Sequence, residues 1–160
     1  AAKFPPDRKR SALIQALFGA QEQNRGFLTD ELITAVAKYL DLPSVWAYEV
    51  ASFYSMLETK PVGRNNVAIC TNISCWLNGA EGLVRHCEKK LGIKLGESTP
   101  DGRIYLKQEE ECIAACVYAP AMTVNGHYHE HLTTEKLDAI LDGLTLDGPV
   151  AHDHDAGESH

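Results

Sequence analysis

Apolar side chains recur at helical spacing through residues 1–60. In Ser11–Gln21 and Glu31–Leu40 they fall three and four positions apart, so each segment predicts an amphipathic helix. Thr29 or Asp30 can cap the second helix, and a third is expected over Ser44–Tyr54. Three short helices of this kind bury their apolar stripes only by packing on each other and on the rest of the chain.

Four aromatic residues belong to or adjoin the third predicted helix. They are Trp46, Tyr48, Phe53 and Tyr54. We expect most of these side chains to be core between the helices and the sheet, because large aromatic groups dominate core packing. Any that stay exposed would form a surface for docking a partner.

The pattern changes near Pro61, where alternation of apolar and polar residues replaces helical spacing. We then expect a strand at Arg64–Ile69, a helix at Ala80–Leu91 and a second strand at Arg103–Lys107. A hairpin of Ala121–Val124 with His127–Glu130 and a helix at Glu135–Leu144 follow. Asn125-Gly126 is a strong hairpin signal, and Thr133 or Thr134 can cap the last helix. Loops are expected at Thr71–Gly79, Gly96–Gly102 and Glu109–Ala119.

The order of these elements predicts the fold class. A strand–helix–strand crossover is parallel and right-handed and a hairpin is antiparallel, so the sheet is mixed. The chain is therefore expected to be α+β. We predict an N-terminal helical bundle over 1–60, a thioredoxin-like domain over 61–146 and a disordered tail over 147–160, which is short of apolar residues.

Composition excludes several classes of function. Apolar residues make up 44% and charged residues 23% of the 160 positions, which excludes wholesale disorder. The formal net charge of −7 provides no electrostatic footprint for nucleic acid. No stretch approaches the roughly 20 apolar residues that span a bilayer, so no direct membrane insertion is expected. The first ten residues lack the apolar run of a signal peptide, which favours ligand or reactive roles for cysteines over disulfides.

Four of the five cysteines form two close pairs. Four residues separate Cys70 from Cys75, and three separate Cys112 from Cys116. Two such pairs brought together by the fold make a four-thiolate site. These spacings are allowed for structural zinc but not typical of it, while a [2Fe–2S] cluster needs four thiolates on a larger frame. Spacing alone thus favours iron–sulfur over zinc without excluding zinc.

The remaining sequence features narrow the chemistry further. A C-x-x-C dithiol is absent, which argues against a thiol–disulfide enzyme. The fifth cysteine, Cys87, lies on the apolar face of a predicted helix and is expected to be a packed core thiol. His127, His129 and His131 are expected to form a solvated strand face, and no role is assigned to the histidines of the tail.

Short motifs accompany the cysteines in a fixed order. They are Arg25-Gly26, Val50-Ala-Ser-Phe-Tyr54, Pro61-Val-Gly63, Asn78-Gly-Ala80, Leu91-Gly-Ile93, Gly96-Glu-Ser-Thr-Pro-Asp-Gly102 and Ala119-Pro120. Through these motifs and the two cysteine pairs the chain resembles the small thioredoxin-like [2Fe–2S] subunits of respiratory complex I (the E subunits). The resemblance runs from about Arg25 to Leu144. It implies that Cys70, Cys75, Cys112 and Cys116 bind one [2Fe–2S] cluster.

The resemblance also implies a function and a partner. It implies an electron-transfer subunit of NADH:quinone oxidoreductase, beside the flavin- and NADH-binding subunit and other subunits of the peripheral arm. The complex would place it in the cytoplasm of a bacterium, peripheral to the inner membrane, or on the matrix side in a mitochondrion. The chain would be part of an enzyme without its own substrate site, and it has no G-x-G-x-x-G motif with which to bind NADH.

Two rival interpretations stay open. The same small subunit occurs in NAD-linked hydrogenases and formate dehydrogenases, which the sequence does not separate from complex I. A zinc-bound structural module that organises an assembly is a rival of a different class.

The chain departs from the family pattern beside two cysteines. Ala114 and Val117 stand where the family often has Gly or, at the second position, a small polar residue. Ala denies the loop the free positive φ of Gly, so we expect tuning of the cluster but not its loss. All-thiolate ligation predicts a low reduction potential, with Glu109–Glu111 as a secondary cause. Trp76 is expected to shield the cluster.

Overall fold

The computed structural model describes residues 8–108 and 112–147. The chain divides after Pro61 into two compact units, each of which is described by itself. The predicted tail falls almost wholly outside the described residues, as do the three glutamates of 109–111.

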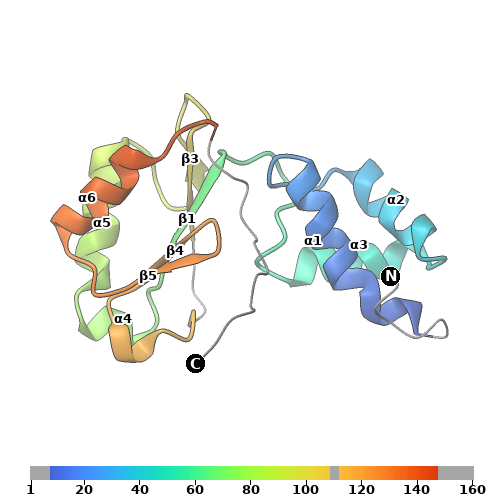
Figure 1. The fold of residues 1–160 in the computed structure, drawn as a ribbon, viewed down its shortest axis with the longest axis horizontal. Coiled ribbons are helices and arrows are strands. Elements are labelled where there is room, and N and C mark those ends of the chain that lie inside the picture. The colour runs from blue at the N-terminus through green and yellow to red at the C-terminus, as the bar shows by residue number, and fades with distance from the viewer. Residues whose placement is uncertain (1–7, 109–111, 148–160) are drawn as a thin grey trace. The chain divides into compact units, whose positions relative to one another are not determined.

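The first unit is helical (Figure 1). A 3₁₀ turn, η1 (Lys9–Ala12), leads into α1 (Leu13–Gln23), which is followed by α2 (Asp30–Tyr39) and α3 (Ser44–Phe53). Of the two predicted caps of α2, Thr29 serves, because its hydroxyl oxygen accepts a hydrogen bond from the Leu32 amide at 3.3 Å.

A buried glutamine closes the core of this unit. The amide nitrogen of Gln21 donates to the carbonyl of Met56 at 3.0 Å, and its oxygen accepts from the Glu58 amide at 2.7 Å. The Gln21 side chain thereby fastens the segment after α3 to α1. The core itself consists of Ala12, Leu13, Leu17, Leu28, Ile33, Ala37, Leu40, Ala47, Ala51 and Leu57.

The expectation that most aromatics of α3 are buried is wrong. Phe53 is 80% exposed, and none of the other three belongs to the buried core. The buried residues of α3 are Ala47 and Ala51, one helical turn apart. Small side chains let a helix approach its neighbours closely, so the aromatic groups are displaced to the flanks.

The second unit is built on a mixed five-stranded sheet of order β2-β3-β1-β4-β5. The strands are β1 (Asn65–Ile69), β2 (Glu97–Ser98), β3 (Ile104–Lys107), β4 (Met122–Val124) and β5 (His127–His129). The central strand β1 runs parallel to β3 and antiparallel to β4, and the β4–β5 hairpin is antiparallel, as predicted. β2 lies in a segment expected to be a loop; its two residues pair with β3 at the edge.

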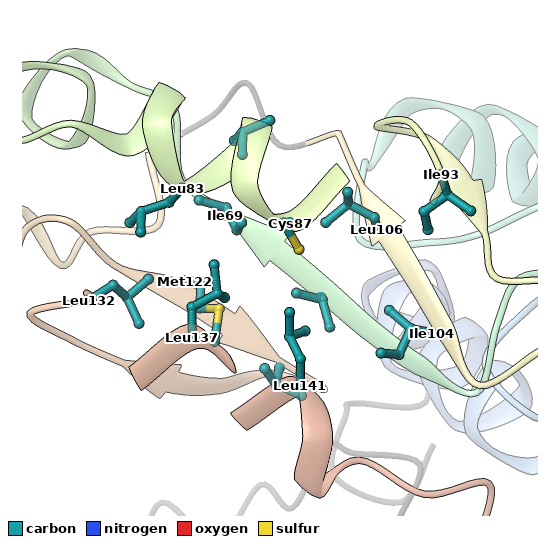
Figure 2. Close-up of a cluster of buried hydrophobic side chains, with 13 residues drawn as sticks. Ile69, Leu83, Cys87, Ile93, Ile104, Leu106, Met122, Leu132, Leu137 and Leu141 are labelled. Atoms are coloured by element: carbon teal, nitrogen blue, oxygen red, sulfur yellow. The ribbon is translucent and has the colours of Figure 1, made fainter. Parts of the chain in front are cut away.

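Two long helices cover one face of this sheet (Figures 1 and 2). They are α5 (Ala80–Leu91) and α6 (Thr134–Gly143), and Thr133 caps α6 by accepting from the Lys136 amide. The side chains between helices and sheet include Val67, Ile69, Leu83, Cys87, Ile104, Leu106, Met122, Val124, Leu137 and Leu141. Cys87 is fully buried among them, which confirms the prediction of a core thiol.

The segment 71–79, expected to be a loop, contains a short helix. This helix, α4 (Ile73–Leu77), begins after Asn72, whose side chain accepts from the Ile73 amide at 2.9 Å. It ends before Gly79, which has a φ of 89°. Five residues are too few to show a helical period, so the sequence pattern does not reveal α4. In the described part of the chain, no helix is long and apolar enough to cross a membrane.

Candidate metal centre

The first cysteine pair lies at the end of the central strand. Cys70 directly follows β1, and its amide donates to the Ala121 carbonyl at 3.1 Å, next to β4. Cys75 follows within α4. Both side chains are buried, at 1% and 2% exposure, and they pack in a small cluster with Ala80, Ala115 and Ala121. The alanines allow the backbone to approach the two sulfur atoms closely.

The second pair lies in the segment between β3 and β4 and is exposed. The Sγ atoms of Cys112 and Cys116 are 3.2 Å apart. Cys116 begins the 3₁₀ turn η2 (Cys116–Tyr118), inside a segment predicted as a loop. The Ala114 amide donates to Cys112 Sγ at 3.4 Å, within the range of a hydrogen bond to sulfur.

Cys70 connects the two pairs. Its thiol is close enough to those of Cys75 and Cys112 to shift the pKa of each. Cys116 is close enough to act electrostatically on Cys75. The fold therefore brings the four predicted cysteines together, from the end of β1, from α4 and from the second loop. No three His, Cys, Asp or Glu side chains among the described residues are grouped as for a single metal ion.

The thiols have divergent proton affinities. Burial raises the pKa of Cys75 to about 11, and the neighbouring Cys70 and Cys116 thiols add to that effect. Hydrogen bonds from the Cys116 thiol and the Ala114 amide lower the pKa of Cys112, while the same thiol contact raises the pKa of Cys116. Four adjacent thiolates repel each other, so full ionisation of this set requires a cationic centre among them.

The structure corrects the expectation about Ala114. The residue adopts a positive φ of 63° although it carries a Cβ. Such a conformation costs an L-residue about 1–2 kcal/mol, so surrounding contacts must hold it. Val117, the second departure from the family pattern, is 81% exposed.

Sequence reasoning missed one polar neighbour of the site. The Ser74 hydroxyl is close enough to the Cys116 thiol to oppose the rise in the pKa of that group. Ser74 directly precedes Cys75 within α4, so its position beside a predicted ligand is visible in the sequence. Only the fold reveals that it reaches the other cysteine pair.

Other residues singled out from the sequence lie around or away from the site. Trp76 is 49% exposed, so it is not packed into the interior. Burial lowers the pKa of His129, whereas His127 is exposed. The His131 ring meets the Tyr118 ring edge-on at 5.7 Å.

Comparison with known proteins decides the family. The model of the thioredoxin-like [2Fe–2S] ferredoxins matches residues 1–145. The chain belongs to this family. Its α+β fold and its [2Fe–2S] cofactor are those of the family, as expected from the sequence.

Relatives of this ferredoxin are named as parts of NADH-quinone oxidoreductases and of an NADH dehydrogenase. The ferredoxin is 47% identical over 145 residues to the E subunit of the NADH-quinone oxidoreductase of Rickettsia bellii, covering 91% of the chain and 86% of the relative. It is 43% identical to an E subunit of the NADH-quinone oxidoreductase of Rhizobium meliloti, covering 90% and 83%. The mitochondrial "NADH dehydrogenase [ubiquinone] flavoprotein 2" of Dictyostelium discoideum is 39% identical, covering 94% of the chain and 63% of the relative.

A solved structure shares the fold. An NAD⁺-reducing [NiFe]-hydrogenase in the air-oxidised state superposes with a TM-score of 0.69 at 23% identity. The match covers 82% of the ferredoxin but 22% of the hydrogenase chain, so the ferredoxin spans about a fifth of that chain. At this identity the likeness establishes the fold.

Proposed function

We propose that this ferredoxin is the electron-transfer subunit of an NADH:quinone oxidoreductase and binds one [2Fe–2S] cluster through Cys70, Cys75, Cys112 and Cys116. The observation that carries the proposal is the meeting of the two cysteine pairs through the Cys70 thiol. A [2Fe–2S] cluster requires four thiolates, two for each iron, and the donor set fits that requirement. The relatives that are subunits of this enzyme support the assignment to a complex.

The surrounding residues are suited to hold a redox centre. A [2Fe–2S] cluster bound here supplies the acceptance and release of one electron at a time. The buried Cys70 and Cys75 keep water from one side of the site. The Ala114 amide donates to Cys112 Sγ and the Ser74 hydroxyl lies near Cys116, where both offset negative charge on sulfur. We propose that all-thiolate ligation nevertheless keeps the reduction potential of the cluster low.

The partner we propose is the flavin- and NADH-binding subunit of the same complex, alongside other peripheral-arm subunits. The second cysteine pair is exposed, which gives an electron a route from outside the chain. Exposed apolar side chains adjoin the ligands: Ile73 and Leu77 are 62% and 70% exposed on the helix that carries Cys75, and Val117 follows Cys116. Exposed apolar groups in such numbers are typical of protein contacts. Within the complex the chain would face the bacterial cytoplasm or the mitochondrial matrix.

Metal and sulfide analysis tests the cofactor assignment. The full chain is purified without oxygen and its EPR spectrum is recorded before and after dithionite. We expect about two irons and two acid-labile sulfides per chain, with a rhombic signal that appears only on reduction. Zinc without sulfide would overturn the proposal in favour of a structural module.

The fifth cysteine provides a matched control for the ligands. Cys112→Ser and Cys75→Ser are expected to lose the cluster, whereas Cys87→Ala keeps it, because Cys87 lies in the core between α5 and the sheet. Retention of a normal cluster by the first two variants would exclude those residues as ligands.

Co-purification tests the partner. In the organism that makes the chain, a tagged copy is expected to recover a flavin-containing, NADH-oxidising subunit together with quinone reductase activity. Recovery with a hydrogenase or a formate dehydrogenase would assign the same cluster to a different NAD-linked complex. This second assignment is tested because a hydrogenase shares the fold.

A further inference from the structure

One peptide group beside the cysteines is held at both of its ends. The carbonyl oxygen of Ile113 accepts a hydrogen bond from the Tyr128 hydroxyl at 2.9 Å. The amide of the next residue, Ala114, donates to Cys112 Sγ at 3.4 Å. This carbonyl and this amide belong to the same planar unit. A bond that fixes the direction of the carbonyl therefore also fixes the direction of the N–H.

The peptide needs such support because the residue after it is strained. Ala114 has a φ of 63°, in the left-handed region that L-residues rarely occupy. A conformation of this kind persists where neighbouring contacts determine it. Among the described residues, the Tyr128 side chain makes such a contact: its hydroxyl donates to the backbone of Ile113, which lies between Cys112 and Cys116 in the sequence.

Tyr128 reaches the loop from a firm support. It lies on β5 and is paired with Thr123 of β4, which in turn pairs with the central strand β1. The chain just after β5 is fastened to the far end of the loop as well, since the His131 amide donates to the Tyr118 carbonyl at 2.8 Å. The hairpin thus anchors the loop at its end, and the Tyr128 hydroxyl orients its middle.

The direction of this N–H bears on the redox chemistry. Hydrogen bonds donated to a ligand sulfur stabilise the more negative, reduced cluster and so raise its reduction potential. A hydroxyl bonded to the carbonyl also polarises the peptide and makes its N–H a better donor.

We propose that Tyr128 is a positioning residue that aims the Ala114 N–H at Cys112 Sγ and thereby raises the reduction potential of the cluster. The inference rests on the proposed function, because it requires a cluster bound by Cys112. It concerns a residue outside the cysteine set and outside its immediate sequence.

The test is a redox titration of the cluster-loaded full chain, followed by EPR. Tyr128→Phe removes one hydroxyl and keeps the ring. We expect its midpoint potential to shift to a more negative value, with the iron and sulfide content of the wild type. Tyr39→Phe, at a 74% exposed tyrosine of α2, is the matched control and should leave the potential unchanged.

A second substitution reverses the sign and keeps the proposal testable if the Phe variant loses its cluster. 3-Fluorotyrosine placed at 128 is a stronger hydrogen-bond donor, and it is measured at a pH well below its ionisation. We expect a shift to a more positive potential. A merely structural role for Tyr128 would not produce shifts of opposite sign.

The outcomes separate the inference from the proposed function. A fully loaded Tyr128→Phe protein with an unchanged potential would overturn the inference alone, as would a fluorinated protein that does not shift or shifts negatively. Absence of iron and sulfide in the wild-type chain would instead overturn the proposed function, and the inference with it.

Discussion

Gly63 lies directly against the backbone of Ile104, the first residue of β3. A Cβ added at Gly63 would come within 2.5 Å of the Ile104 carbonyl carbon and 2.7 Å of the Tyr105 amide nitrogen. The Gly63 amide also donates to Ser98 Oγ at 2.9 Å. The chain therefore enters the central strand β1 through a gap that admits no side chain.

Gly63→Ala is expected to destabilise the protein by about 1–3 kcal/mol, because overpacking against backbone forces the strand entry to shift. Gly82→Ala is the matched control: this glycine lies within α5, and an added Cβ would have no atom within 4 Å apart from its chain neighbours and the adjacent helix backbone. The control should gain about 0.5–1 kcal/mol, since Ala is favoured over Gly in a helix. Urea unfolding measures both, and equal effects would contradict the close approach at Gly63.

The strained Ala114 predicts a graded response to side-chain size. Ala114→Gly relieves the cost of a positive φ but adds freedom to the unfolded chain, so its free energy of unfolding should stay within about 1 kcal/mol of the wild type. Ala114→Val places a β-branched residue at this φ and should destabilise by about 1–3 kcal/mol. Thermal unfolding and iron content are measured for the wild type and both variants. A Val variant as stable as the Gly variant would show that the loop does not hold Ala114 at positive φ.

The burial of Cys87 is expected to lower the free energy of unfolding at alkaline pH. Burial raises its pKa to about 12, with help from the negative charge of Asp138, against 9.0 for an ordinary thiol. Between these values the unfolded state has released a proton that the folded state retains. Stability attributable to Cys87 is therefore complete below pH 9.0 and falls by about 1.4 kcal/mol per pH unit between pH 9.0 and about 12.

The comparison with Cys87→Ala isolates this effect, because other alkaline titrations occur in both proteins. The difference in unfolding free energy between the two proteins is expected to narrow steadily above pH 9.0. A difference that does not vary with pH would show that the Cys87 thiol ionises without hindrance in the folded chain.

Asp138 fastens α6 to α5 and makes that contact sensitive to acid. Its carboxylate lies 2.8 Å from His86 Nε2 and 3.4 Å from Lys90 Nζ. The hydrogen bond with His86, followed by that with Lys90, holds the pKa of Asp138 below 3.8. The contribution is present above 3.8 and is lost as the pH falls through the lower, folded pKa.

Asp138→Asn is expected to be less stable than the wild type at neutral pH and to lose less stability on acidification. Asp41→Asn serves as the control, since the Asp41 side chain is 88% exposed and its ion pair with Lys9 spans 3.7 Å. Exposed pairs of this kind contribute little. Thermal unfolding at neutral and acidic pH reads out both variants. An equal loss of thermal stability on acidification for the wild type and Asp138→Asn would show that Asp138 does not cause the acid sensitivity.

Local pattern predicts most of the elements because their signals are local. Leu83, Val84 and Cys87 recur at helical spacing and mark the buried face of α5, while Asn125-Gly126 marks the hairpin. The threonines that cap α2 and α6 are also predictable to within one residue. Short elements such as α4 and β2 escape, since five and two residues show no periodicity.

The sequence by itself determined two cysteine pairs, their motifs and an α+β order of elements, and it favoured iron–sulfur over zinc. Residue type and spacing are covalent properties, so they can be recognised in the sequence without knowledge of the fold. Only the tertiary structure decided which groups surround the sulfurs. Ser74 lies near Cys116, and the Tyr128 hydroxyl donates to the Ile113 carbonyl, 42 and 15 positions away along the chain. Contacts of that kind depend on how sheet, hairpin and loop pack, and no local pattern encodes them.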